Sequence, residues 1–132
     1  MRFYCSDDTV DLEQYPYHVR DVHISDPFIL ADPKSRCYYT YVQFADTERF
    51  PDVETDKENG VFYVFESKDL IHWSKPQICF RQNNFWADKD YWAPEVHIWK
   101  GRYYLFSSFR ADGHYRKCQC LVSDSPKGPF EP

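Results

Sequence analysis

The sequence predicts an all-β protein whose antiparallel strands form β-propeller blades. Short runs of aromatic and β-branched residues, about four to eight residues long, alternate with Gly, Pro, Asp and Asn along the chain. No long stretch has the periodicity of an amphipathic helix. The order of strand and turn motifs also repeats once, which is typical of stacked units of short strands. A β-meander or β-sandwich, in which the repeat reflects only shared strand composition, is the alternative.

The composition fits one folded domain over residues 1–132. Hydrophobic residues make up 42% of the chain and aromatic residues 20%, which is enough for a packed core. The net charge is −5, and the 16 basic residues are scattered rather than gathered into a stripe that could neutralise phosphates. We therefore expect no nucleic-acid partner.

The hydrophobic runs are too short for a membrane span, and the first residues lack the apolar core of a signal peptide. These features predict a cytoplasmic protein with no membrane partner. Cysteines stand at positions 5, 37, 79, 118 and 120, and their odd number argues against a secreted disulfide framework. We expect reduced thiols, with Cys118 and Cys120 on one face of a strand as small core residues.

Six strands are expected in chain order, each defined by apolar, aromatic or β-branched residues. They cover residues 28–30, 37–44, 61–67, 95–99, 102–109 and 117–123. Turn residues separate them, namely DPKS at 32–35, NG at 59–60, KG at 100–101, DG at 112–113 and SPKGP at 125–129. This succession of strands and turns predicts antiparallel neighbours.

Two longer segments are expected to be loops. Residues 81–90 are polar but contain Phe85 and Trp86 beside acidic residues, which predicts a loop at the entrance to a blade. Residues 52–59 are acidic and predict a solvated hairpin loop. This segment has Lys where a calcium loop of the helix-loop-helix type requires Gly, so we reject a calcium-binding interpretation.

The repeated order of motifs divides the chain into two blades. The first copy contains DPFIL at 26–30, YYTY at 38–41 and VFESKDLIHW at 64–73. The second contains APEVH at 93–97, YYLF at 103–106 and LVSDSP at 121–126, with Phe130 in the aromatic role of Trp73. Loop lengths differ while the order is kept, which predicts one blade over residues 20–80 and another over residues 91–132.

The segment YWAPEVH at 91–97 is the most informative part of the sequence. It sets the carboxylate of Glu95 among aromatic rings at the entrance to a strand. Sugar rings need apolar surfaces for stacking, and cleavage of glycosidic bonds needs carboxylates that move protons. The segment therefore indicates carbohydrate chemistry.

Taken together, these motifs resemble glycoside hydrolase family 43, five-bladed β-propeller enzymes that act on arabinose- and xylose-containing glycans. The matching parts are SDPFI at 25–29, SKDLIHW at 67–73, WAPEV at 92–96 and SDSPKGPF at 123–130. The resemblance covers roughly residues 20 to 132, well under half of the family's usual catalytic domain. It implies a glycosidase of the arabinofuranosidase or xylosidase kind, with an oligosaccharide or polysaccharide as substrate.

The resemblance also implies roles for two carboxylates. Asp26 takes the position of the general base, which activates a water molecule in an inverting mechanism. Pro27 should hold Asp26 in an extended backbone at the start of a strand. Glu95 takes the position of the carboxylate that raises the pKa of the catalytic acid and orients the substrate, although many members have Asp there.

The family's catalytic acid, a Glu in the third blade, has no counterpart in this sequence. We therefore expect a chain that is truncated before the acid and has little activity, because general acid catalysis commonly supplies about 10²- to 10⁴-fold. Two isolated blades would also leave open strand edges that favour self-association. The alternatives are a non-catalytic carbohydrate-binding module and an interaction fragment that completes its propeller with another chain.

Aromatic side chains near the second blade opening are the candidates for contact with sugar, with packing between blades as the alternative for each. They are Trp86, Trp92, Phe85 and His97. Trp73 and Trp99 are expected in the core. The remaining histidines lack the spacing of metal ligands, so we expect no metal ion and no cofactor. No Gly-x-Ser-x-Gly motif supports a Ser-His-Asp triad.

Overall fold

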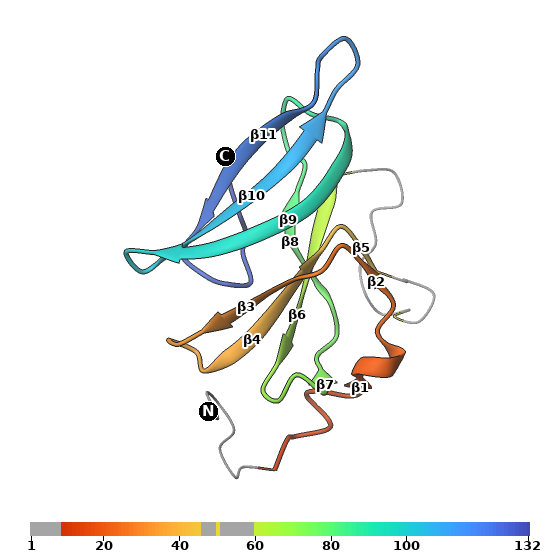
Figure 1. The fold of residues 1–132 in the computed structure, drawn as a ribbon, viewed down its shortest axis with the longest axis vertical. Coiled ribbons are helices and arrows are strands. Elements are labelled where there is room, and N and C mark those ends of the chain that lie inside the picture. Colours follow the sequence, from red (N-terminus) through yellow and green to blue (C-terminus); the bar gives the residue numbers. More distant parts are fainter. Residues whose placement is uncertain (1–8, 46–49, 51–59) are drawn as a thin grey trace.

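The computed structural model describes residues 9–45, 50 and 60–132 of the chain. Antiparallel strands form a six-stranded sheet, a three-stranded sheet and a two-stranded ribbon (Figure 1). The one helix in this part of the chain is a short 3-10 helix, Val19–Asp21. The strands are β1 (Tyr17–His18), β2 (Ile24–Ser25), β3 (Phe28–Asp32), β4 (Cys37–Val42), β5 (Phe44–Ala45), β6 (Val61–Ser67), β7 (His72–Trp73), β8 (Gln77–Arg81), β9 (Lys89–Trp99), β10 (Arg102–Arg110) and β11 (Lys117–Ser123).

Strands β4 and β6 form the centre of the first sheet. β3 pairs with β4 on one side, and β7 and β8 pair with opposite ends of β6 on the other. Every residue of β6 is buried, because alternate side chains enter two different hydrophobic clusters. One cluster receives Phe62 and Val64, and the other receives Val61, Tyr63 and Phe65. A strand buried on both faces has a continuous apolar run, and residues 61–65 of β6 form one.

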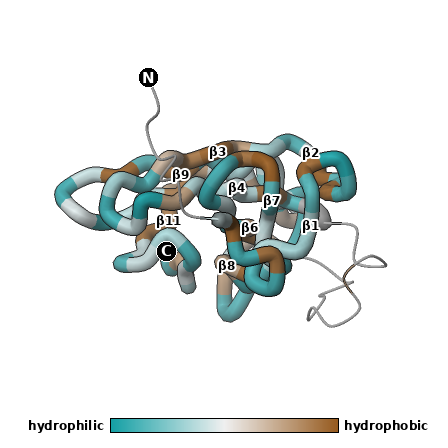
Figure 2. The backbone as a smooth tube through the Cα atoms, turned by 90° about the horizontal axis from the view of Figure 1, so that it is seen from below, coloured by the Kyte–Doolittle hydropathy of each residue, from teal (hydrophilic) through white to brown (hydrophobic). Residues whose placement is uncertain are grey.

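The second sheet contains β9, β10 and β11 and buries one face. Buried and more exposed residues alternate along β10, where Tyr103, Leu105 and Phe109 are buried. Leu105 pairs with Val96 of β9 and Leu121 of β11, which extends the buried face across all three strands. The hydrophobic sequence of β3, at the facing edge of the first sheet, is visible in Figure 2. The buried face belongs to the same hydrophobic cluster as β4, β6 and β8 of the first sheet.

Aromatic rings fill the space between the two sheets. The Phe62 ring of β6 lies 5.9 Å from the Tyr91 ring of β9 and 6.0 Å from the Phe109 ring of β10, between centroids. Phe80 of β8 lies 5.8 Å from Tyr91. The rings are tilted against each other rather than stacked face to face, which aromatic pairs favour. The buried Tyr91 hydroxyl donates a hydrogen bond to the Ala87 carbonyl at 2.6 Å, so the cluster leaves this polar group satisfied.

The segment that follows β11 folds back onto the first sheet. The Tyr41 hydroxyl donates a hydrogen bond to the Pro126 carbonyl at 2.7 Å, and the Phe130 N–H donates one to the Cys79 carbonyl at 2.8 Å. Phe130 and Trp73, which are predicted to correspond in the repeat, are both buried. The second sheet is therefore held to the first by its C-terminal segment as well as by the core.

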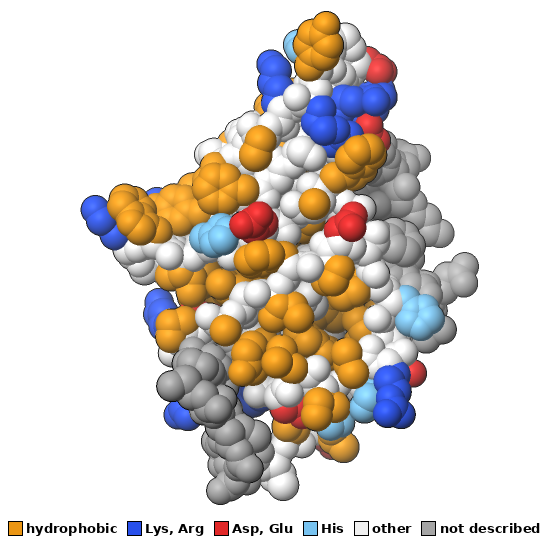
Figure 3. Space-filling model, in the orientation of Figure 1, with side chains coloured by type: hydrophobic (Ala, Val, Ile, Leu, Met, Phe, Trp, Pro, Cys, Tyr) orange, Lys and Arg blue, Asp and Glu red, His pale blue; other side chains and the backbone are white. Residues whose placement is uncertain are grey.

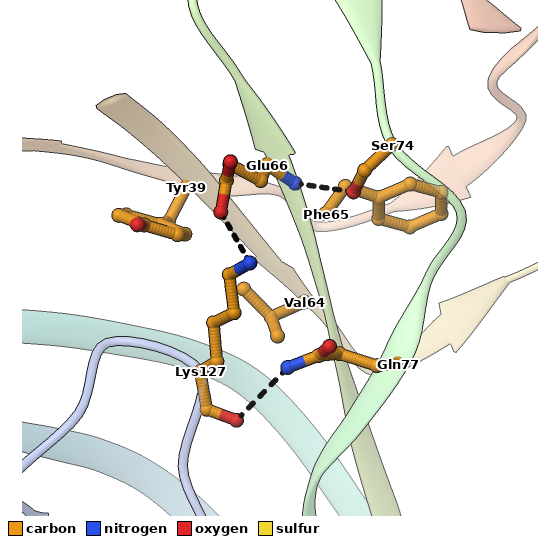
Figure 4. A pocket seen from close by; sticks show the side chains of 7 residues that line it. All are labelled: Tyr39, Val64, Phe65, Glu66, Ser74, Gln77 and Lys127. Atoms are coloured by element: carbon orange, nitrogen blue, oxygen red, sulfur yellow. Dashed lines mark hydrogen bonds and ion pairs between the residues drawn. The ribbon is translucent and has the colours of Figure 1, made fainter. Parts of the chain in front are cut away.

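Glu66 of β6 connects three parts of the chain that are distant in sequence. Its carboxylate accepts a hydrogen bond from the Tyr15 hydroxyl at 2.5 Å and forms an ion pair with Lys127 (Figure 4). Burial alone would raise the pKa of Glu66. The hydrogen bonds from Lys127 and Tyr15 outweigh burial and hold this pKa below its ordinary value. The ionised carboxylate thus ties the N-terminal segment and the segment after β11 to the first sheet.

Several predicted strands have the observed positions. Strands 61–67 and 117–123 have the observed bounds, whereas 28–30 extends to residue 32 and 102–109 to residue 110. The predicted strand 37–44 is interrupted at Gln43, which separates β4 from β5. The KG turn at 100–101 is confirmed, and both of its residues have positive φ, as a tight hairpin turn requires.

Other secondary-structure predictions were incomplete. Residues 81–90 are a loop only in part, because Arg81 ends β8 and Lys89 begins β9, well before the predicted start of that strand at 95. Strands β1, β2, β7 and β8 were not predicted. The acidic segment 52–59 and Cys5 lie outside the described residues.

Three residues predicted in the core are not buried. Trp99 is 59% exposed, Cys118 is exposed and Cys120 is half-buried. The register places Cys118 opposite Ser108 and Cys120 opposite Phe106. The two cysteines therefore share a face, as predicted, but it is the face of the second sheet that is turned away from the core. The described cysteines are free thiols.

Gly128→Ala should destabilise the fold more than a matched Gly113→Ala control. Both glycines have a left-handed backbone, with φ of 79° and 76°, so each variant should lose about 1–2 kcal/mol for that conformation. A Cβ on Gly128 would lie 2.3 Å from the Cys79 carbonyl oxygen, whereas one on Gly113 would meet nothing within 4 Å. We expect a further loss of about 1–3 kcal/mol for this overlap. Denaturant unfolding measures the difference, and equal losses would contradict the close approach at Cys79.

Acid should weaken the wild-type fold more than that of Glu66→Gln. Because the folded-state pKa of Glu66 is lowered, its stabilising contribution is present above the ordinary value of 4.5 and is lost as the pH falls through the folded value. We expect E66Q to melt at a lower temperature than wild type near neutral pH. Below pH 4.5 the gap should narrow. Thermal melts across this pH range test the ion pair with Lys127. A difference in melting temperature between wild type and E66Q that does not change with pH would contradict it.

Candidate active site

The edge strands of the two sheets, β3 and β9, lie against each other in the middle of the molecule (Figure 1). The Phe28 ring of β3 lies 5.6 Å from the His97 ring of β9, between centroids. Asp26 stands just before β3, and Glu95 lies within β9. The two carboxylates predicted from the sequence therefore belong to neighbouring strand edges.

Asp26 lies in a bend between β2 and β3, and it is exposed. Its φ is 47°, in the left-handed region, although Pro27 follows it. The predicted extended backbone at Asp26 is therefore wrong. β2 pairs with β5 just before this residue, and β3 pairs with β4 just after it. The chain must turn between these two pairings, and Asp tolerates the left-handed region better than most residues.

Gln43 connects Asp26 to the second sheet. Its side-chain Nε2 donates a hydrogen bond to Asp26 Oδ2 at 3.1 Å, and its Oε1 accepts one from the backbone N–H of Ala93 at 2.9 Å. This residue was not predicted from the sequence. The available signal was weak, namely a polar amide near the end of the predicted apolar strand 37–44.

A bulge in β9 shapes the region around Glu95. Two residues of β9, Ala93 and Pro94, stand opposite the single residue Ser107 of β10. The Ser107 hydroxyl donates a hydrogen bond to the Trp92 carbonyl at 2.6 Å, and Ala93 has a φ of 51°. Residues three apart in a regular strand point to opposite faces. The bulge adds one residue, so Trp92 and Glu95 lie on the same face of the sheet.

His97 is the nearest partner of the Glu95 carboxylate. Its Nε2 lies 2.5 Å from Glu95 Oε1, and both side chains are about half exposed. The imidazole packs between Phe28 of β3 and Phe106 of β10, with centroid distances of 5.6 and 6.1 Å. His97 thus fixes one oxygen of Glu95 and occupies the junction between the two sheets.

Trp92 is positioned by an arginine that the sequence did not single out. The Arg116 guanidinium lies 3.6 Å from the centroid of the Trp92 ring, a cation–π contact. The same guanidinium donates hydrogen bonds to the Asp90 carbonyl at 2.9 Å and to the Ser108 hydroxyl at 3.1 Å. One face of the indole is therefore covered, and Trp92 is 48% exposed.

Trp86 and Phe85 are not brought to this face. Trp86 donates a hydrogen bond from Nε1 to Gln119 Oε1 at 2.6 Å. Gln119 pairs with Ser107, and both side chains lie on the buried face of the second sheet. Trp92 and Glu95 lie on the opposite face, so Trp86 is not beside them. Phe85 is partly buried and packs 4.9 Å from the ring of Phe109, so packing accounts for it.

The resulting face offers exposed carboxylates beside apolar surface. Acidic side chains in the middle of the face in Figure 3 lie among hydrophobic ones, with a histidine next to one of them. Such an arrangement can place a sugar ring against apolar atoms while a carboxylate moves a proton.

Within residues 9–45, 50 and 60–132, no group of three or more His, Cys, Asp or Glu side chains is placed to hold a metal ion. The same residues include no helix long and apolar enough to cross a membrane.

Solved structures similar to this chain are carbohydrate-active enzymes. An endo-arabinase from Bacteroides thetaiotaomicron is 38% identical, with a TM-score of 0.75, and the match covers 89% of this chain and 37% of that one. A thermostable family-43 glycoside hydrolase is 29% identical, with a TM-score of 0.65 and coverage of 83% and 32%. An endo-1,4-beta-xylanase from Bacteroides thetaiotaomicron is 25% identical, with a TM-score of 0.61 and coverage of 84% and 33%. The chain thus spans about a third of the length of these structures.

No curated protein matches the chain. The prediction of an all-β fold made of antiparallel propeller blades is confirmed, and the two sheets are part of a propeller. The family model of glycosyl hydrolases family 43 matches residues 18–132. The chain belongs to glycosyl hydrolases family 43.

Proposed function

We propose that this chain supplies the general base and the second carboxylate of a glycosidase that cleaves arabinose- or xylose-containing glycans with inversion. The observation that carries the proposal is the placement of Asp26 and Glu95, both exposed, on neighbouring edge strands within the matched segment. The similar structures include an endo-arabinase and an endo-1,4-beta-xylanase, which supports this substrate class.

Asp26 is the proposed base. In an inverting reaction, a carboxylate removes a proton from a water molecule as the water attacks the anomeric carbon. The bond to the leaving oxygen breaks at the same time, and a separate acid gives that oxygen a proton. We assign the acid to no residue of this chain. One oxygen of the Asp26 carboxylate accepts a hydrogen bond from Gln43. The residue is exposed, so the carboxylate can contact water.

Glu95 is the proposed second carboxylate. A negative charge near a catalytic acid disfavours its ionisation and so keeps the acid protonated. One carboxylate oxygen of Glu95 is hydrogen-bonded to His97, and the side chain is 54% exposed. Glu95 can therefore also accept a hydrogen bond from a sugar hydroxyl. Trp92 on the same face is the best candidate for an apolar platform, because its ring is exposed and held in place by Arg116. Contact of His97 with sugar remains part of the proposal; for Trp86 and Phe85, packing is the stronger interpretation.

Asp26→Asn should abolish turnover of aryl arabinofuranosides or xylosides by the natural protein that contains residues 1–132. Asn keeps the size of the side chain and tolerates a left-handed backbone, so the fold should persist while the base is lost. We expect kcat to fall about 10²- to 10⁴-fold. Asp124→Asn, at an exposed Asp in the turn after β11, is the matched control and should leave kcat unchanged. Undiminished turnover in D26N would remove Asp26 from the mechanism.

Glycan titration separates the enzyme from a non-catalytic binding module. Addition of arabino- or xylo-oligosaccharides should change the tryptophan fluorescence of the protein, because Trp92 is exposed beside the carboxylates. Trp92→Phe should reduce that change, whereas Trp73→Phe, at a buried tryptophan, should not. Release of reducing sugar by the wild-type protein supports the glycosidase. The hydrolysis assay uses the natural protein that contains residues 1–132, because the acid is assigned to no residue of this chain. Binding without any hydrolysis by that protein would favour the module.

A further inference from the structure

We propose that Gln43 is a positioning residue that orients the Asp26 carboxylate and fixes it to the second sheet, an inference that rests on the proposed function of Asp26. Gln43 stands between β4 of the first sheet and β5 of the two-stranded ribbon, and its amide contacts both Asp26 and the backbone of Ala93. It is the side chain through which the entry to β3 is hydrogen-bonded to the bulge of β9.

The orientation of the Gln43 amide follows from the chemistry of its partners. A backbone N–H can only donate, so the Gln43 atom 2.9 Å from the Ala93 nitrogen must be the oxygen. The amide nitrogen is then directed at Asp26 Oδ2, at 3.1 Å. An ionised carboxylate can only accept, and the NH₂ group supplies the donor. Both contacts agree with one orientation of the amide, so the side chain can make them at the same time.

The two residues that Gln43 joins both have unusual backbone conformations. Asp26 has a φ of 47° and Ala93 a φ of 51°. Left-handed conformations at residues other than glycine persist where the surroundings hold them, and they concentrate at functional sites. The Gln43 amide bonds directly to the side chain of one and to the N–H of the other. It therefore holds Asp26 at a fixed place relative to Glu95, two residues beyond Ala93.

The position of the base decides its efficiency. Misplacement of a reacting group by about 1 Å can cost about 10²-fold in rate. Asp26 is exposed, and Gln43 is the partner through which its carboxylate is tied to β9. Loss of the amide would leave the carboxylate free to rotate while its charge and reach stay the same. The expected consequence is a lower kcat with little change in KM.

A double-mutant cycle in the 132-residue chain tests the contact itself. In Gln43→Glu the side chain can still accept the Ala93 N–H, but it cannot donate to an ionised Asp26 and places two like charges within hydrogen-bond distance. We expect its melting temperature to fall by about 2–4 °C near neutral pH. In the double variant D26N/Q43E, the amide introduced at position 26 can donate to the carboxylate introduced at position 43, and the melting temperature should return toward that of D26N alone. Additive effects of the two substitutions would overturn the proposal.

Turnover by the natural protein that contains residues 1–132 tests the positioning role. Gln43→Met keeps the length of the side chain without either hydrogen bond, and we expect kcat to fall about 10- to 100-fold with KM within about 2-fold of wild type. D26N/Q43E should regain thermal stability yet remain without turnover, because the base itself is absent. The fall in kcat of Q43M at nearly unchanged KM is the readout that a purely structural role does not produce. Gln14→Met, at an exposed residue remote from the site, is the control and should not change kcat.

The outcomes separate this inference from the proposed function. If Q43M turns over substrate like wild type while D26N does not, Gln43 has no positioning role and the function of Asp26 stands. If D26N turns over substrate undiminished, the proposed function fails, and the inference about Gln43 fails with it. A fall in kcat for Q43M at unchanged KM, together with non-additive melting temperatures, supports the inference.

Discussion

Packing of the second sheet against the first is the constraint on which the rest of the structure depends. A three-stranded sheet has no core of its own and must bury its apolar face against another element. Here Tyr91 and Phe109 of the second sheet meet Phe62 and Phe80 of the first. The segment after β11 then returns to the first sheet, where Gly128 passes so close to Cys79 that no side chain would fit. The two sheets are consequently fixed to each other at the core and at the chain end.

This packing brings the edges of the two sheets together and creates the candidate site. β3 and β9 become neighbours because their sheets are packed, not because they are hydrogen-bonded to each other. The entry to β3 and the bulge of β9 then require left-handed backbone at Asp26 and Ala93. These irregular positions direct Asp26 and Glu95 away from the core. Gln43 links Asp26 to β9 of the second sheet. The regular part of the fold thus supplies rigidity, and the irregular part supplies the chemistry.

The sequence predicted the regular part of this structure well. β6 and β11 are each seven residues long, contain apolar residues and are bounded by turn residues, so the pattern was sufficient to find them. β8 was missed because QICFR is only five residues long and both begins and ends with a polar residue. The two carboxylates were found through motifs shared with a family rather than through periodicity. Asp26 and Glu95 could be identified in this way without knowledge of the local backbone. That backbone could not be predicted from the neighbouring residues.

The misplaced residues have physical explanations. Alternation assigns a face only while the strand is regular, and the bulge at Ala93 and Pro94 shifts that alternation for Trp92 relative to Glu95. The rule for residues before proline predicts extended backbone at Asp26, but the change of pairing partner from β5 to β4 imposes a turn there. Gln43 carries no sequence signal of its function, because its role exists only once the two sheets are packed.

The stereochemistry of the reaction tests the central claim most directly. Proton NMR of the first product formed by the natural protein that contains residues 1–132 distinguishes the two anomers before they equilibrate. If Asp26 acts as a base on water, the released sugar has the anomeric configuration opposite to that of the substrate. Release of the sugar with retained configuration would mean that a carboxylate attacks the anomeric carbon directly, and it would contradict the assignment of Asp26 as general base.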